Sequence, residues 1–397
     1  MNSRVRFGVD SVCASPSYWL PSARQVGLVT NDAARLAADP TRLSRLALLD
    51  AAIPLVRLFA PEHGLSSAAA DGTSVSDQTD PRTGLPVYSL YGERVRPSTE
   101  SLRDLDVVLF DIPDVGARFY TYSSTLYHMM AACAEAHLPL IVLDRPNPLG
   151  GDLTNAEGPL LDPACRSFVG EAVIPLRHQL TLGELARLWN RERFPTASLR
   201  VIPCEGWSRR MTWPDTGLPW VTTSPAMPTF ASVRGYPVTG IFEATNLSVG
   251  RGTARPFQLV GAPWLESDRV VRRLATWAMR GVEFAATTFL PTSSRYQGEW
   301  CQGVELRIAD AGTRHSVAAG MLLLASIVGT HREAFQWATY PTAANPTGEG
   351  HFERLCGRRD IRPVFDARPD TIDLDTVHEW TSTGDWTERV QEVLLYR

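Results

Sequence analysis

An acid and an imidazole stand next to each other where an apolar stretch of this chain ends. The run IPLVRLFA (residues 53–60) has the composition of a buried strand, and Pro61, Glu62, His63 and Gly64 follow it. A carboxylic acid that is partly shielded from water can remain protonated near neutral pH and deliver its proton to a substrate. Glu62 is therefore a candidate general acid and His63 a group that orients it or contacts the substrate, although a glutamate here could also cap a turn.

Three further apolar runs, residues 25–31, 106–112 and 138–143, also end in polar side chains. The residues at these ends, or shortly after them, are Thr30, Asn31, Asp111, Asp114, Arg118, Tyr120, Tyr122, Asp144, Arg145 and Asn147. Because ligands of an open parallel sheet bind at the carboxyl ends of its strands, we expect these groups to line one cleft.

Several of these groups also have a purely structural interpretation. Asp111 and Asp114 could hold the loop DIPDVGARF together, and Arg118 could be an internal ion-pair partner for one of them. The spacing of His63, Asp111 and Asp114 matches no specific metal-binding motif, so we expect no metal.

The segments between the apolar runs are typical of helices. Residues 41–52, 123–137 and 181–192 repeat apolar side chains at helical spacing, and Thr181 and Glu184 have the spacing of a capping box. Apolar strands that alternate with helices predict an α/β fold, in which helices cover both faces of a mostly parallel sheet.

The later part of the chain predicts a second, smaller unit. Residues 282–292 and 303–310 read as strands and residues 316–335 as a helix, which is an α+β pattern. We place the domain boundary so that residues 1–256 form the α/β domain and residues 257–397 form the C-terminal domain.

The composition excludes several kinds of chemistry. The chain has 397 residues, a formal net charge of −4 and no lysine, since all 39 basic residues are arginine. A Schiff-base lysine, a Walker A lysine and a Ser-x-x-Lys site are therefore excluded. No Gly-x-Gly-x-x-Gly follows the first strand and no Gly-x-Ser-x-Gly occurs, so we expect neither a nucleotide cofactor nor a serine hydrolase of the α/β type. The net charge gives no reason to expect a nucleic acid partner.

The chain carries no sign of membrane insertion. No stretch approaches 18 apolar residues and the first residues contain no apolar signal core, so we expect a cytoplasmic protein. A leader missing from this sequence would instead make the protein periplasmic or secreted. The six scattered cysteines form no Cys-x-x-Cys pair and predict buried thiols.

Several strings of this chain resemble those of glycoside hydrolase family 171, the exo-β-N-acetylmuramidases. In order between residues 25 and 305 they include GLVTN, PEHG, TGLPVYSLYG, FDIPDVGARFYTY, LDRPNPLGG, SPAMPT, EATNLSVGRGT and PFQLVGAPW. The resemblance implies a Rossmann-like domain that holds no nucleotide, a smaller C-terminal domain that closes a cleft, and no cofactor. It also implies release of terminal N-acetylmuramic acid from the non-reducing end of peptidoglycan-derived oligosaccharides or muropeptides.

The resemblance also assigns catalytic residues. The family's catalytic glutamate lies in the Pro-Glu-His-Gly string, which here gives Glu62. Glycoside cleavage needs negative charge near an oxocarbenium-like centre as well as a proton donor. Asp114 or Glu243 could supply that charge, or the 2-acetamido group of the substrate could act as the nucleophile.

The matched strings supply candidate substrate contacts as well. These are Asn31, Arg118, Tyr120, Tyr122, Arg145, Asn147, Asn246 and Arg251. N-acetylmuramic acid has a lactyl carboxylate that N-acetylglucosamine lacks, and a guanidinium pairs with a carboxylate through two hydrogen bonds. Arg118 and Arg251 are therefore our candidates for this discriminating contact.

The chain departs from the family strings at four positions. Pro113 stands where the family usually has Gln, Ala226 where it has Asn, Ala244 where it has Gly, and Val249 where it has Glu. The departures at Ala226 and Val249 support an alternative hypothesis, a catalytically inactive protein that binds muropeptides or sugars on the same fold.

Overall fold

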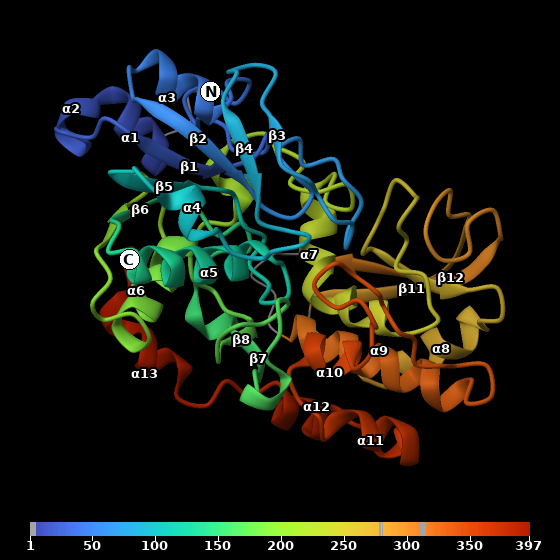
Figure 1. The fold of residues 1–397 in the computed structure, drawn as a ribbon. Helices are drawn as coiled ribbons and strands as arrows, with labels where there is room; N and C mark the ends of the chain where they lie inside the picture. Colours follow the sequence, from blue (N-terminus) through green and yellow to red (C-terminus); the bar gives the residue numbers. More distant parts are fainter. Residues whose placement is uncertain (1–4, 278, 280, 310–314) are drawn as a thin grey trace.

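A seven-stranded sheet forms the centre of the N-terminal half of the chain (Figure 1). The computed structural model describes residues 5–277, 279, 281–309 and 315–397. In spatial order the strands are β3 (Gln78–Thr79), β4 (Pro86–Ser89), β2 (Leu55–Ala60), β1 (Val26–Thr30), β5 (Val107–Asp111), β6 (Leu140–Leu143) and β9 (Leu199–Ile202). All neighbouring strands are parallel except β3 and β4. The six parallel strands follow the doubly wound 3-2-1-4-5-6 order, which confirms the predicted Rossmann-like sheet.

Helices cover both faces of this sheet because its strands are apolar on both sides. In β5, Val108 and Phe110 pack in one hydrophobic cluster, whereas Val107 and Leu109 pack in another on the opposite face. The helices of the first cluster are α5 (Tyr122–Glu135) and α6 (Leu182–Glu192), and those of the second are α1 (Gly8–Ala14) and α3 (Ser44–Asp50). The short helices α2 (Pro16–Trp19) and α4 (Thr99–Leu102) complete this domain.

The predicted capping box starts α6. The Thr181 hydroxyl accepts a hydrogen bond from the Glu184 amide at 3.1 Å, and the Glu184 carboxylate accepts one from the Thr181 amide at 3.1 Å. Two backbone donors at the start of the helix are thereby satisfied. The predicted helices at 41–52, 123–137 and 181–192 correspond to α3, α5 and α6 with ends shifted by three residues or fewer.

A smaller α+β domain is present, as predicted, and it contains a three-stranded antiparallel sheet (Figure 1). Its strands are β10 (Leu259–Ala262), β12 (Cys301–Ile308) and β11 (Val282–Phe289), and its helices are α7 (Phe230–Thr239), α8 (Ser267–Leu274) and α9 (Ser316–Thr330). The strand predicted at 303–310 ends at Ile308, and residue 310 lies outside the described residues. The core of this domain is α9, of whose 15 residues 13 are buried.

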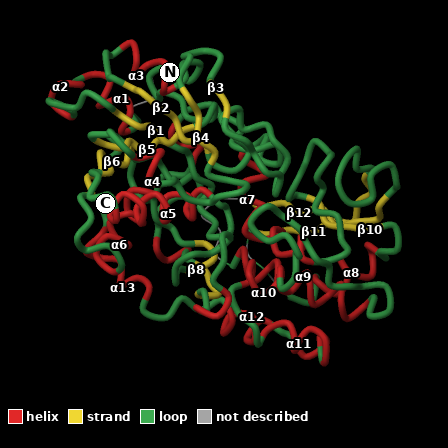
Figure 2. Tube along the Cα trace, in the orientation of Figure 1, coloured by secondary structure: helices red, strands yellow, loops and turns green. Residues whose placement is uncertain are grey.

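The remaining strands and α-helices lie outside the two larger sheets. They are the hairpin of β7 (Glu157–Leu160) and β8 (Pro175–Arg177), and the helices α10 (His351–Cys356), α11 (Ile361–Ala367), α12 (Leu374–Trp380) and α13 (Trp386–Val390). Figure 2 shows that loops fill much of the junction between the sheets. This abundance of loops explains why strand and helix periodicity could not predict the junction.

The C-terminal segment returns to the first domain, where α13 lies beside α6 (Figure 1). The indole N–H of Trp386 donates to the His178 carbonyl at 3.0 Å, and Arg187 donates to the Leu394 carbonyl at 3.2 Å. Because α7 packs against α9, with Val238 next to Gly320, we describe α7 and the residues that follow it with the smaller domain. The domain boundary that we placed at residue 256 stays a prediction.

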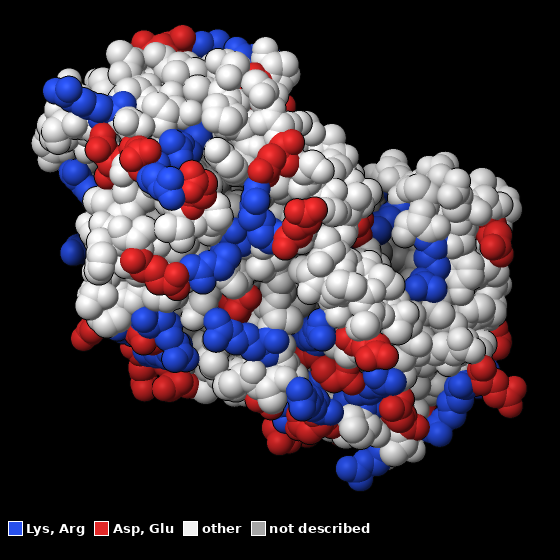
Figure 3. Space-filling view, in the orientation of Figure 1, with Lys and Arg blue, Asp and Glu red and all other residues white. Residues whose placement is uncertain are grey.

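The surface carries mixed charge. On the face shown in Figure 3, arginines and acidic side chains are interspersed rather than separated into one basic and one acidic area. Within the described residues, no helix combines the length and apolarity that a membrane span requires.

Close packing of α9 against α7 gives a stability prediction. A Cβ added at Gly320 would lie 2.1 Å from the Val238 carbonyl oxygen, so alanine must push the two helices apart. Glycine to alanine usually stabilises a helix by about 1 kcal/mol, whereas overpacking costs about 1–3 kcal/mol. We expect Gly320→Ala to lower the midpoint of thermal unfolding.

Ser326→Ala is the matched control in the same helix. The Ser326 hydroxyl is buried and has no hydrogen-bond partner among the described residues. Its removal should leave stability unchanged or raise it. A Gly320→Ala protein as stable as the wild type would contradict the close packing.

Candidate active site

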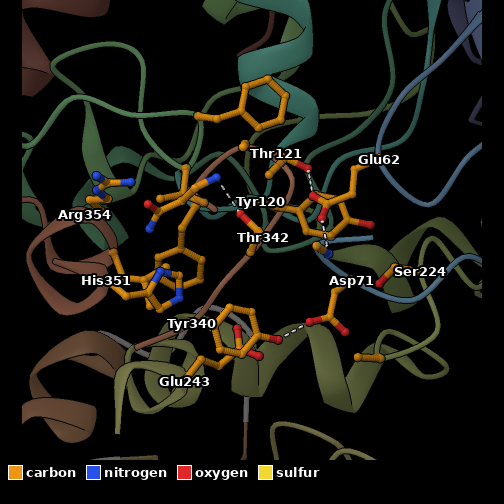
Figure 4. A pocket seen from close by; sticks show the side chains of 18 of the residues that line it. Glu62, Asp71, Tyr120, Thr121, Ser224, Glu243, Tyr340, Thr342, His351 and Arg354 are labelled. Atoms are coloured by element: carbon orange, nitrogen blue, oxygen red, sulfur yellow. Dashed lines mark hydrogen bonds between the residues drawn. The ribbon is translucent and has the colours of Figure 1, made fainter. Parts of the chain in front are cut away.

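A pocket lies at the junction of the two domains, beyond the end of β2 (Figure 4). It is a recess between protein atoms that is partly open to solvent. Its polar lining residues include Glu62, His63, Asp71, Tyr91, Tyr120, Thr121, Ser167, Ser224, Glu243, Arg251, Tyr340, Thr342, Asn345, His351 and Arg354. Both domains contribute to this lining, as the cleft hypothesis requires.

Glu62 is held at the pocket by two hydrogen bonds. Its side chain is 7% exposed; Oε1 accepts from the Gly72 amide at 2.8 Å, and Oε2 is 2.6 Å from the Thr121 hydroxyl. A hydroxyl can donate or accept. When Glu62 is protonated on Oε2 it can therefore donate to Thr121, and when it is ionised it can accept from Thr121. Both states of a proton donor thus fit the same geometry.

The turn after β2 explains how Glu62 reaches this place. His63 and Gly64 both adopt left-handed backbone conformations, with φ of 68° and 70°, so the chain reverses directly after Glu62. His63 Nδ1 lies 2.8 Å from the Ala69 carbonyl and donates to it, which closes the loop. His63 lines the pocket, but this hydrogen bond joins it to Ala69 rather than to Glu62.

Arg251 joins two carboxylates on the other side of the pocket. Its Nε donates to Glu243 at 2.7 Å and its Nη1 donates to Asp71 at 2.8 Å, while the guanidinium lies 5.1 Å from the centre of the Phe257 ring. The Tyr340 hydroxyl also donates to Asp71. One positive and two negative charges give this cluster a net charge of −1 when both acids are ionised.

The two acids of this cluster differ in their environments. Burial raises the pKa of Glu243, although the Arg251 charge opposes the rise. Burial acts in the same sense on Asp71, but the Arg251 charge and the Tyr340 hydroxyl outweigh it and lower the pKa of Asp71 below its usual value. Asp71 therefore carries a negative charge at neutral pH.

The loop that carries Asp71 also supplies the amide that holds Glu62. Gly72 donates to Glu62, and the Gly72 carbonyl accepts from the Ala343 amide at 2.8 Å. The C-terminal domain therefore contacts this loop at both residues, through Arg251 and Tyr340 at Asp71 and through Ala343 at Gly72. The position of the Glu62 carboxyl depends on contacts between the domains.

Some predicted site residues line this pocket and others do not. The residues that line it are Glu62, His63, Tyr120, Glu243 and Arg251. The residues that do not are Asn31, Asp114, Arg118, Tyr122, Arg145, Asn147 and Asn246. The expectation that all four strand ends line one cleft is therefore wrong, because most of these groups bind one another or the backbone.

Three of the predicted polar groups hold the strand ends together. Arg145 forms a buried ion pair with Asp111 at 2.7 Å. Asn147 donates to the Leu180 carbonyl at 2.9 Å, and Asn31 donates to the Tyr122 hydroxyl at 3.0 Å. These contacts satisfy groups that sequence alone could have assigned to a ligand.

Asp144 and Asn246 also form hydrogen bonds within the protein. Asp144 accepts from Tyr396, Thr181 and Gly183, and burial raises the pKa of Asp144 to about 6. Asn246 accepts from the Gln336 amide at 3.0 Å and donates to the Ala334 carbonyl at 2.8 Å.

Asp114 and Arg145 instead contribute to a second, mostly apolar pocket at the ends of β1, β5 and β6. The rings of Trp213 and Trp220 also line it, edge to face with centres 5.3 Å apart. Asp114 accepts from the Gly116 amide at 3.1 Å and lies 3.6 Å from His178 Nε2.

Arg118 is fully buried and bonded to the backbone. It donates to the carbonyls of Pro159 and Ile174 at 2.6 and 2.9 Å, and to those of Leu355 and Cys356 at 3.1 and 2.8 Å. Burial lowers the pKa of Arg118 to about 10. Arg118 therefore connects the β7–β8 region to the C-terminal end of α10.

Sequence reasoning missed several pocket residues, among them Asp71, Thr121, Tyr340, His351 and Arg354. Asp71 lies in the segment SSAAADGTS, where Asp-Gly indicates only a turn. Tyr340, His351 and Arg354 follow residue 305, beyond the strings that resemble the family. In the described part of the chain, no three His, Cys, Asp or Glu residues gather in a way that could hold a metal ion.

Comparisons with known proteins identify the family of the chain. The model "Exo-beta-N-acetylmuramidase NamZ, N-terminal" matches residues 26–231, and its C-terminal counterpart matches residues 234–396. The peptidoglycan beta-N-acetylmuramidase NamZ of Bacillus subtilis (strain 168) is 40% identical over 361 residues, which are 90% of this chain and 84% of that protein.

Two crystal structures of DUF1343 family proteins from Bacteroides fragilis NCTC 9343 have the same fold. One has a TM-score of 0.88 and 31% identity, with 100% of both chains covered. The other has a TM-score of 0.76 and 26% identity, with 100% of this chain and 99% of that chain covered. The resemblance stated from the sequence strings is thus confirmed, and this chain belongs to the exo-β-N-acetylmuramidase NamZ family.

Proposed function

We propose that this chain is a glycoside hydrolase that releases terminal N-acetylmuramic acid from the non-reducing end of peptidoglycan-derived saccharides. The observation that carries the proposal is that the Glu62 carboxyl lines the same pocket as the cluster of Asp71, Glu243 and Arg251. The name of the Bacillus subtilis relative supports the same reaction.

The geometry assigns a role to each side of the pocket. Glu62 gives its proton to the glycosidic oxygen as the bond to the anomeric carbon breaks, and Thr121 and Gly72 keep the carboxyl oriented. The cluster of Glu243, Asp71 and Arg251 then stabilises the positive charge that develops on the sugar. Water completes the hydrolysis.

The second carboxylate of the reaction is Glu243 rather than Asp114. Glu243 lines the pocket with Glu62, whereas Asp114 lies in the other pocket. Asp71 adds a second ionised group to the same cluster. A carboxylate near the anomeric carbon can act in either of two mechanisms. It can attack that carbon as the nucleophile, or it can orient the acetamido group of the substrate, which then attacks instead.

The inactive binding-protein hypothesis has less support. Of the four departures from the family strings, Ala226 lines the pocket, Ala244 and Val249 are buried in the core, and Pro113 lines the other pocket. Replacement of Asn by Ala at one wall changes the shape of the site and leaves the proton donor in place.

Glu62→Gln should abolish proton donation while keeping the size of the side chain. We expect kcat for a MurNAc-β-1,4-GlcNAc disaccharide to fall at least ~100-fold. The fall should be much smaller for p-nitrophenyl β-N-acetylmuraminide, because p-nitrophenolate leaves without a proton. Steady-state kinetics on both substrates measure this difference.

Glu135→Gln is the control for this variant, since Glu135 lies at the exposed end of α5 and forms a surface ion pair with Arg96. Its activity should match the wild type. Equal losses on the two substrates in Glu62→Gln would mean that Glu62 is not the proton donor. Full activity in that variant would remove Glu62 from the reaction.

Glu243→Gln and Asp71→Asn should each take one negative charge from the cluster. We expect kcat to fall about 10–100-fold in both variants, because less negative charge remains to stabilise the transition state. Asp114→Asn should keep kcat within about threefold of the wild type. Kinetics on the disaccharide, with unfolding midpoints to show that each variant is folded, test the assignment; a folded but inactive Asp114→Asn protein would instead make Asp114 the second carboxylate.

A further inference from the structure

A pocket that selects N-acetylmuramic acid needs a group that recognises its lactyl ether. This substituent at C3 ends in a carboxylate and carries a methyl group, and N-acetylglucosamine has a hydroxyl in its place. A guanidinium that has no other anion to bind is the most suitable protein group for such a carboxylate. The arginines around the pocket can therefore be compared by what they already bind.

The two arginines expected from sequence already have partners. Arg118 does not line the pocket and binds four backbone carbonyls. Arg251 lines the pocket but pairs with Glu243 and Asp71, and the net negative charge of that cluster would repel a third carboxylate. Neither arginine is suited to the lactyl group.

Arg354 lies at another end of the pocket. It lies on α10 and is partly exposed, and Figure 4 shows it across the pocket from Glu62. In the described part of the chain, no ion pair or hydrogen bond engages its guanidinium. The neighbouring Glu353 pairs with Arg362 at 3.2 Å instead.

Arg354 supplies the positive charge at its end of the pocket, since the neighbouring His351 is neutral. His351 stacks on the Tyr340 ring, with centres 4.8 Å apart and planes at 10°. Burial, and next the Arg354 charge, lower the pKa of His351 to about 4, so its imidazole is neutral at neutral pH.

The segment beside α10 completes a site for the lactyl group. The Ser167 hydroxyl lines the pocket, is shielded from water, and has no hydrogen-bond partner among the described residues. Val169 and Leu355 supply apolar surface to the same pocket. Arg118 ties the segment between β7 and β8, which holds Ser167, to the end of α10.

We propose that Arg354 binds the lactyl carboxylate of the terminal N-acetylmuramic acid and so sets the preference for this sugar over N-acetylglucosamine. The proposal rests on the proposed function, because it places the anomeric carbon at Glu62. C3 lies two ring atoms from the anomeric carbon, so its substituent points away from Glu62, and Arg354 also lies away from Glu62 in the pocket (Figure 4). Ser167 is a second hydrogen-bond donor for the carboxylate, and the lactyl methyl group contacts the apolar surface.

The first test compares Arg354→Gln with the wild type on p-nitrophenyl glycosides of N-acetylmuramic acid and N-acetylglucosamine. We expect kcat/KM for the muramic substrate to fall about 10–100-fold, mainly through KM, and the low activity on the glucosamine substrate to change by less than about twofold. Arg354→Lys keeps the charge but loses the planar guanidinium, so its kcat/KM for the muramic substrate should lie between those of the wild type and Arg354→Gln. Arg307→Gln is the matched control, because Arg307 lies exposed on β12, pairs with Glu305 outside the pocket lining and should change neither value.

A change in the substrate complements this test. When the lactyl carboxylate is converted to its methyl amide, the wild type should lose the same factor that Arg354→Gln loses, and the variant should lose little more. The assignment of Arg354 would be overturned if Arg354→Gln lost the same factor in kcat/KM on both sugars. It would also be overturned if kcat/KM of the variant fell on the amide by the full factor seen in the wild type. Either result would leave the hydrolase proposal intact.

Calorimetric binding of the free monosaccharides keeps the two proposals separate. If the wild type hydrolyses no muramic substrate, the proposed function fails. Arg354 is then judged by whether the wild type binds N-acetylmuramic acid more tightly than N-acetylglucosamine and whether Arg354→Gln loses that preference. An unchanged preference in the variant would overturn the inference.

Discussion

The contact between Asp71 and Arg251 is the interaction on which the rest of the site depends. Asp71 belongs to the loop after β2, and Arg251 lies in the segment between α7 and β10. The pair is largely buried, so both charges depend on surrounding protein groups more than on water. Tyr340 and Glu243 provide the additional hydrogen bonds that such a pair needs. The next residue, Gly72, holds Glu62, so the interdomain pair and the proposed proton donor share the loop between β2 and β3.

The same arrangement explains why Glu62 could be found from sequence only as one candidate among several. The apolar runs predicted the strands correctly, and the polar residues at their ends were located correctly along the chain. Whether such a residue meets a ligand or a protein partner depends on groups that are distant in sequence. Asp144 binds Tyr396, which lies 252 residues further along, and Asp111 binds Arg145 from the neighbouring strand. No local pattern contains these partners, so Glu62 and Asp144 look alike in the sequence.

The residues that sequence reasoning missed have a common cause as well. Helix and strand periodicity predicted α3, α5, α6 and α9, because each buries a continuous apolar face. Asp71, Tyr340 and Arg354 lie in a loop, an irregular segment and a six-residue helix, where apolar spacing carries little information. Their positions follow from contacts such as Ala343 with Gly72 and Arg118 with the end of α10. The family strings identified Glu62 and Glu243, but the carboxylate and cation that complete the pocket required the three-dimensional structure.

The fold also explains why the active pocket does not lie where a Rossmann sheet usually binds its ligand. In doubly wound sheets the ligand site is the crevice where the strand order reverses, here between β1 and β5. That place has a mostly apolar lining with Trp213, Trp220 and Pro113, and Arg145 nearby is neutralised by Asp111. The pocket lies instead beyond β2, where the second domain can reach the chain. A hydrolase that acts on one terminal sugar needs walls on several sides, and loops from two domains can supply them where a single sheet edge cannot.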